Sequence, residues 1–261
     1  MRAVGVHEDV VVIRSAVWQT SCIAVRGGEE AFVIDSPVLP HELEALPAVL
    51  AQARFTVVGL VATHADWDHL LGSLAFPEAP LGVGEATARR LAAEPGRAQR
   101  EMRRWDEEHY VQRPRPLSLG AVQELPVPGH LEVGDYELEL HPAGGHTADG
   151  TALYISWADV LCPGDYLSPL EIPLLGQGGS LPAYRQTLER LAPLVERAAL
   201  VVPGHGAPVQ RERALGLLEE DLAYLAALER DGGRAPLPGG RRSAAQRRVH
   251  ASNVELVAGG P

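Results

Sequence analysis

The chain has 261 residues, of which 46% are hydrophobic and 22% charged, as in a globular protein of one large domain or two small ones. Its formal net charge of -11 argues against nucleic acid or an anionic membrane as the main partner, because both bind basic surfaces. The sequence shows neither the ~18 apolar residues of a membrane span nor the apolar region of a signal peptide. We therefore expect a cytoplasmic protein that acts on a small molecule.

Strand and helix signals alternate along the first half of the chain. Runs rich in β-branched residues predict strands over 10–17, 21–37 and 57–64. Helical spacing predicts helices over 40–54, 68–76 and 84–110, the last broken near Pro95 and Gly96. A hairpin turn is expected where RGGEE interrupts the second of these strand runs.

The second half repeats the same kind of series with more hairpins. Strands are predicted over 122–128, 129–145, 151–165 and 199–206, and helices over 181–198 and 212–230. A strictly alternating parallel fold would have fewer hairpins than this. We therefore expect an α+β protein with two mixed sheets and helices outside them.

Composition divides the chain after Arg230. The segment 231–242 reads as a linker, and the residues after it predict one further helix capped by Ser243. We assign 1–230 to the main domain and 231–261 to a linker and C-terminal helix. That helix would expose apolar side chains unless it packed on the domain or on the second subunit of a homodimer.

One six-residue stretch, HADWDH from His64 to His69, places four acidic or imidazole side chains directly after an apolar run. Like charges this close repel one another, and carboxylates are costly to remove from water. A bound cation would relieve both problems, so the stretch indicates a metal site.

Three later stretches supply further candidate ligands. His146 in GGHTADG, Asp165 in LCPGDYL and His205 in VVPGHG each stand in a glycine-containing loop just after a predicted strand. Ligands at strand ends gather at one edge of a sheet, where sites in mixed α/β folds usually lie. Each stretch alone is a weak signal, and the four together in this order are a strong one.

With these four stretches in this order, the sequence resembles the metallo-β-lactamase superfamily. The resemblance covers nearly the whole chain to about Arg230. The resemblance implies a four-layer αβ/βα sandwich with two metal ions at one edge of the paired sheets. The metal ligands it implies are His64, Asp66, Asp68, His69, His146, Asp165 and His205. FVIDSP resembles the family's early strand that ends in an aspartate, which places Asp35 next to the site without making it a ligand.

Asp66 departs from the family's pattern, which has a histidine there. By resemblance, one ion takes His64, Asp66 and His146, the other takes Asp68, His69 and His205, and Asp165 bridges them. Two divalent ions contribute +4 and three carboxylates -3, so the substitution leaves a less positive site. Zinc is the expected metal, and a hard oxygen ligand lets manganese or iron compete at the Asp66 position.

The expected function is that of a metal-dependent hydrolase. A hydroxide held by the metals would attack an ester, thioester, lactone or phosphodiester, with Asp68 orienting it. Two alternatives stay open: a non-heme iron oxidoreductase of the same fold, suggested by the carboxylate of Asp66, and a non-catalytic metal-binding protein. The segment 84–116 often forms a flap in this superfamily, so Trp105, His109 or Tyr110 is a candidate for substrate contact.

Overall fold

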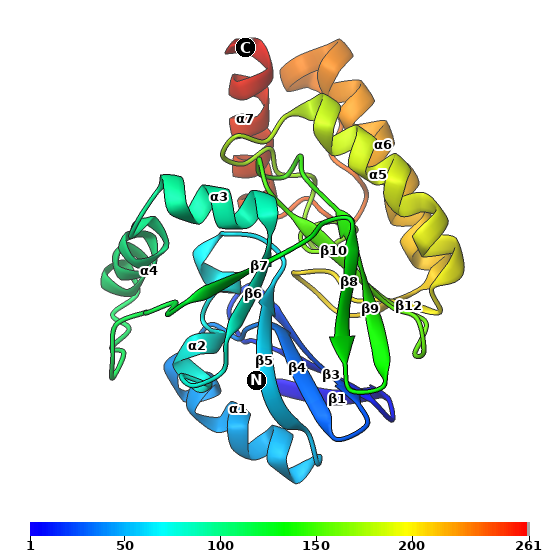
Figure 1. The fold of residues 1–261 in the computed structure, drawn as a ribbon. Helices are drawn as coiled ribbons and strands as arrows, with labels where there is room; N and C mark the ends of the chain where they lie inside the picture. Colours follow the sequence, from blue (N-terminus) through cyan, green and yellow to red (C-terminus); the bar gives the residue numbers. More distant parts are fainter. Residues whose placement is uncertain (260–261) are drawn as a thin grey trace.

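Two β-sheets lie at the centre of the molecule, with helices on their outer faces (Figure 1). The computed structural model describes residues 1–259. The first sheet has the order β1-β2-β3-β4-β5-β6-β7 and the second β13-β12-β11-β10-β9-β8. Both are mixed, since β4 to β7 pair in parallel and β11 pairs in parallel with β12, while the other pairings are antiparallel. The predicted four-layer αβ/βα sandwich is confirmed.

The strands of the two sheets are short, and helices separate some of them along the chain. The first sheet consists of β1 (Arg2–His7), β2 (Val10–Arg14), β3 (Ser21–Gly27), β4 (Glu30–Asp35), β5 (Thr56–Ala62), β6 (Leu81–Gly84) and β7 (Val122–Leu125). The second consists of β8 (Gly129–Val133), β9 (Tyr136–Pro142), β10 (Thr151–Ile155), β11 (Val160–Cys162), β12 (Leu200–Val201) and β13 (Val209–Gln210).

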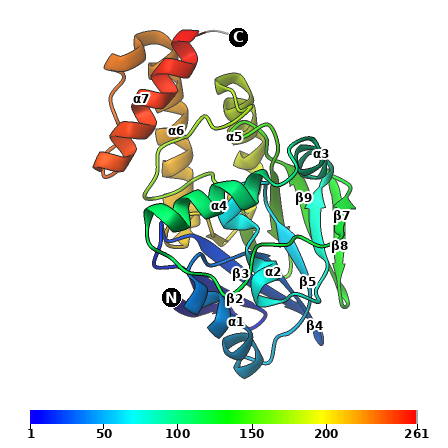
Figure 2. The same cartoon turned by 90° about the vertical axis from the view of Figure 1, so that its left-hand side faces the viewer.

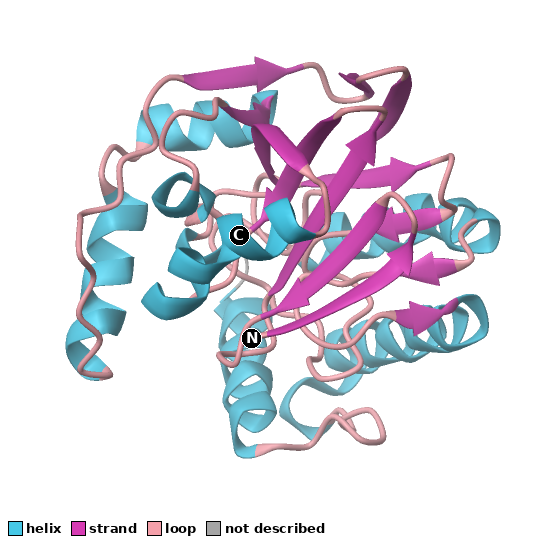
Figure 3. Ribbon diagram, turned by 90° about the horizontal axis from the view of Figure 1, so that it is seen from below, coloured by secondary structure: helices cyan, strands magenta, loops and turns pink. Residues whose placement is uncertain are grey.

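Helices cover the outer faces of both sheets (Figure 3). The helices are α1 (Pro40–Gln52), α2 (Gly72–Ala75), α3 (Glu85–Ala93), α4 (Arg97–Glu108), α5 (Leu181–Arg197), α6 (Arg211–Asp231) and α7 (Ala244–Gly259). Buried side chains of α1 and α4 pack on the first sheet, and those of α5 and α6 pack on the second. A third apolar cluster joins the facing sides of the two sheets, with Val25 and Val61 from one and Leu140 and Leu153 from the other.

Three short features differ from the sequence-based expectation. The predicted helix over 68–76 is a 3-10 turn (Trp67–His69) followed by the four residues of α2. Strands β1 and β6 were not predicted, because β1 lies at a largely exposed edge and β6 has the glycine-rich sequence LGVG. The break at Pro95 and Gly96 is confirmed, since α3 ends at Ala93 and α4 begins at Arg97.

The C-terminal segment packs against the second half of the domain, where α7 lies beside α6 (Figure 2). Val249 and Val254 pack on the apolar cluster of α5 and α6. Asn253 is fully buried and its amide binds the loop after β11: its Nδ2 donates to Pro173 O at 2.6 Å, and its Oδ1 accepts from Leu175 N at 2.9 Å. Residues 260 and 261 of the predicted C-terminal unit lie outside the described part of the chain. None of the described helices is long and apolar enough to cross a membrane.

These contacts predict that substitutions at two positions of α7 change the stability of the protein by different amounts. Asn253→Ala should lower the free energy of unfolding by about 2 kcal/mol, because it leaves buried backbone groups of the loop without partners. Leu256→Ala is the matched control on the same helix, and since Leu256 is 40% exposed its effect should stay within about 0.5 kcal/mol. Chemical denaturation of both variants measures this. Equal stability of the two variants would show that α7 is only loosely attached.

Candidate metal centre

The seven candidate ligands converge at one edge of the sandwich, although they come from four separate loops. The HADWDH stretch follows β5, and the loops after β9, β11 and β12 bring His146, Asp165 and His205. Three overlapping groups of three ligand atoms lie within 4.8 Å of one another: His64, His69 and Asp165; His64, Asp66 and His146; Asp68, His69 and His205. All seven residues predicted from the sequence are therefore brought together.

One half of the cluster contains His64, Asp66 and His146. Oδ2 of Asp66 lies 3.6 Å from Nε2 of His64 and 3.7 Å from Nε2 of His146. Oδ2 of Asp165 lies 3.7 Å and 3.3 Å from the same two nitrogens. Ligands about 2.1 Å from a tetrahedral metal stand roughly 3.4 Å apart, so these spacings suit one metal ion.

The other half contains Asp68, His69 and His205 with the same spacing. Oδ2 of Asp68 is 3.6 Å from Nε2 of both histidines. Asp165 reaches this half too, with Oδ1 3.4 Å from His69 Nε2 and Oδ2 3.3 Å from His205 Nε2. Asp165 therefore stands between two ligand groups, as a bridging carboxylate requires.

Hydrogen bonds at Nδ1 hold the imidazole rings with Nε2 facing inward. Nδ1 of His146 lies 3.0 Å from Leu174 O, and Nδ1 of His69 lies 2.9 Å from Oδ2 of Asp35. Because a carbonyl or carboxylate oxygen only accepts, both rings carry a proton on Nδ1, and Nε2 is the nitrogen left to bind a metal ion. The expectation that Asp35 lies next to the site agrees with this contact.

Four buried atoms of the cluster have no hydrogen-bond partner among the residues that the structure describes. They are Nε2 of His64, His69 and His146 and Oδ1 of Asp165. An unpaired buried polar atom costs about 1–3 kcal/mol, so four at one point are a large penalty. Metal ligation would satisfy all four, and the donor set therefore fits a pair of divalent ions.

Electrostatics favour positive charge at the same point. Burial disfavours protonation of His146 and His205, but neighbouring carboxylates, chiefly Asp66 and Asp165, outweigh it and raise their pKa values to about 9 and about 10. Burial also opposes charge on Asp66 and Asp165, yet the surrounding imidazoles hold the pKa of each carboxyl well below its usual range. The carboxylates thus attract cations, either protons or metal ions.

Two charged residues at the site were missed by sequence reasoning. Arg90 of α3 donates to Oδ1 of Asp66 at 2.7 Å and to Oδ1 of Asp149 at 2.6 Å. Asp149 stands three residues after His146 in the same glycine-containing loop. This position was the only feature of the sequence that could have indicated that Asp149 lies at the site. Nothing in the sequence distinguishes Arg90 from the other arginines of its charged helix.

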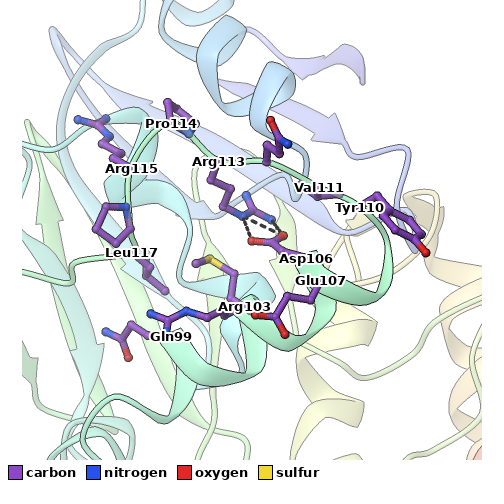
Figure 4. A pocket seen from close by; sticks show the side chains of 13 residues that line it. Gln99, Arg103, Asp106, Glu107, Tyr110, Val111, Arg113, Pro114, Arg115 and Leu117 are labelled. Atoms are coloured by element: carbon purple, nitrogen blue, oxygen red, sulfur yellow. Dashed lines mark hydrogen bonds and ion pairs between the residues drawn. The ribbon is translucent and has the colours of Figure 1, made fainter.

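The aromatic residues of the 84–116 segment lie beside the motif. Trp105 stacks on His109 at 4.4 Å between ring centroids and lies 5.5 Å from Trp67, within a cluster that Trp18 completes. Tyr110 is 94% exposed and points away from α4 (Figure 4). Substrate contact by any of these side chains stays a prediction.

A cavity of about 620 Å³ lies between α4 and the segment 110–117 (Figure 4). Asp106 and Arg113, which form an ion pair at 2.8 Å, are among the residues that line it. None of the seven clustered ligands lines this cavity, so we place the candidate site at the histidines instead.

The chain matches the family model described as Metallo-beta-lactamase superfamily over residues 16–205. A comparison with curated proteins gave no match. A solved metallo-beta-lactamase family protein from Thermus thermophilus is 21% identical, with a TM-score of 0.67 and coverage of 98% of this chain and 95% of that one. The DIM-1 metallo-beta-lactamase exposed to ceftazidime is 20% identical, with a TM-score of 0.58 over 84% of this chain and 96% of that one.

The stereoselective inverting sec-alkylsulfatase Pisa1 from Pseudomonas sp. is 15% identical, with a TM-score of 0.74. The alignment covers 99% of this chain but 50% of the sulfatase. At such identities these three likenesses show a shared fold, and the family match carries the assignment.

The contact between Asp35 and His69 predicts an effect on metal binding. Asp35→Asn keeps the shape but removes the carboxylate that fixes the ring, so zinc affinity should fall about 10- to 100-fold. Competition with a chromogenic chelator measures it. Asp9→Asn is the control, because that carboxylate pairs with Arg26 away from the cluster and its loss should leave affinity unchanged. An equal affinity for the Asp35 variant and the wild type would contradict the role.

Proposed function

Because the chain belongs to the metallo-β-lactamase superfamily, we propose that it is a hydrolase with two divalent ions in the site described above. The ligands in this proposal are His64, Asp66, Asp68, His69, His146, Asp165 and His205. The single observation that carries it is the set of four buried ligand atoms without hydrogen-bond partners among the described residues, all gathered at the sheet edge.

Bound ions would supply a nucleophile from water at neutral pH and polarise the target oxygen of the substrate. The protein itself would hold the ligands in place and accept a hydrogen bond from the attacking water. Oδ2 of Asp68 faces Nε2 of His69 and His205 at 3.6 Å, and the side chain stays 10% exposed, so its second oxygen would be left to accept a hydrogen bond from the attacking water. Ester, thioester, lactone and phosphodiester substrates all fit this role.

Zinc is the metal we propose for both positions, because each half offers two imidazoles and one carboxylate. Asp66 stands where the family has an imidazole, so manganese or iron should compete better at that position than it would against three imidazoles. A small-molecule substrate, a cytoplasmic location and a homodimer complete the proposal.

A substrate panel on metal-loaded protein tests the proposed function. Protein loaded with zinc, manganese or iron should bind two ions per chain and hydrolyse at least one member of the panel, and chelation should abolish the activity. The panel includes a β-lactam and a secondary alkyl sulfate, because solved proteins of this fold are named for them. Oxygen consumption by the iron form without any hydrolysis would favour the oxidoreductase, and tight metal binding without turnover would favour a binding protein.

Variants of Asp66 test its place among the ligands. Asp66→Ala should leave about one ion per chain, because the half with His64 and His146 loses an oxygen while the other half stays complete. Asp66→His should keep two ions and shift preference from manganese towards zinc, since imidazole is the softer ligand. Mass spectrometry of metal content under competition measures both. Two ions and full activity in Asp66→Ala would remove Asp66 from the ligand set.

A further inference from the structure

Arg90 occupies an unusual place at the edge of the candidate metal centre. Its side chain is only 11% exposed and reaches from α3 to the start of the HADWDH stretch. One terminal nitrogen, Nη2, lies 2.7 Å from Oδ1 of Asp66, and the other, Nη1, lies 2.6 Å from Oδ1 of Asp149. Both ends of the guanidinium are therefore engaged by carboxylates.

Asp149 is itself fixed and buried. It is 2% exposed, and its second oxygen, Oδ2, accepts a hydrogen bond from the backbone N–H of Ala65 at 2.9 Å. The two aspartates thus connect Arg90 to consecutive residues of the motif, Ala65 through its backbone and Asp66 through its side chain. Three segments that are distant in sequence meet at this one guanidinium.

The two carboxylate oxygens of Asp66 contact different groups. Oδ1 pairs with Arg90, while Oδ2 faces Nε2 of His64 and His146 at 3.6 and 3.7 Å. Asp66 is 30% exposed on its side chain, so without Arg90 the carboxylate would be free to rotate towards solvent or to offer both oxygens. With Oδ1 bound to Arg90, the carboxylate of Asp66 presents only Oδ2 to the cluster, as an imidazole presents only one nitrogen.

We propose that Arg90 is a positioning residue that, with Asp149, makes Asp66 a one-oxygen ligand for the ion beside His64 and His146. This inference rests on the proposed function, because it assigns Arg90 to one of its two metal positions. Arg90 and Asp149 carry opposite charges, so the pair orients Asp66 without adding net charge. The contribution of the 84–116 segment to the site is then a guanidinium from α3.

A double-mutant cycle between Arg90 and Asp66 tests the proposal. Arg90→Met keeps much of the bulk of the stem and should weaken one of the two ions about 10- to 100-fold while changing the other less than about threefold. In an Asp66→His background, where no carboxylate needs orienting, Arg90→Met should cause no further loss at that position. Stepwise chelator competition on zinc-loaded protein and the absorption spectrum of cobalt-loaded protein are the readouts.

Two further variants separate positioning from general stability. Arg90→Met leaves Asp149 buried without its cation, so Arg90→Met combined with Asp149→Asn removes that penalty and should still weaken the same ion. Arg97→Met is the matched control, since Arg97 pairs with Glu94 and Glu101 at the surface of α4 and should leave both affinities unchanged. Thermal unfolding of each metal-free variant shows whether it is folded.

The outcomes distinguish this inference from the proposed function. Wild-type protein that binds fewer than two ions would overturn the proposed function and this inference with it. Two ions in the wild type with unchanged affinities in both Arg90 variants would overturn the inference alone. Equal weakening of both ions, or a loss that persists in the Asp66→His background, would also overturn it, because Arg90 would then act on the fold as a whole.

Discussion

The concentration of carboxylates at one buried edge is the constraint on which the rest of this structure depends. Asp35, Asp68 and Asp165 gather with four imidazoles where little water reaches them, and the more exposed Asp66 joins them at the edge. Such a group is stable only if positive charge is present at its centre. The two sheets, the strand-end loops and the buried hydrogen bonds behind the histidines all serve to keep that group assembled.

The imidazoles are held from behind by different parts of the chain. His69 is fixed by Asp35 at the end of β4, and His146 by the carbonyl of Leu174. Ser168 donates to the backbone oxygen of His205 at 2.7 Å, so the loop after β11 supports both late histidines. The precision of the centre therefore comes from residues outside the ligand set, as is usual for metal sites.

The pattern of strands and helices was sufficient to predict two mixed sheets with helices outside them, while the four-layer sandwich and the full set of seven ligands were implied by the resemblance to the family. Strand-forming runs followed by glycine-containing loops place His146, Asp165 and His205 at strand ends. The helical spacing of apolar residues was enough to predict α5 and α6. What the sequence did not reveal depends on distance in space: Arg90 looks like any surface arginine until α3 is folded against the motif. The helix predicted over 68–76 was largely wrong because the motif takes a tight 3-10 turn that local propensity does not encode.

The loop that supports His146 is itself attached to the last helix, and this has a consequence for how the protein matures. Asn253 binds the backbone on both sides of Leu174, whose carbonyl orients His146. Synthesis proceeds from the N-terminus, so the HADWDH stretch is made early and its support at Asn253 very late. The loop that orients His146 therefore has its contacts with Asn253 only after α7 has been made and has docked, so metal binding at that histidine would depend on a helix far from it in the sequence.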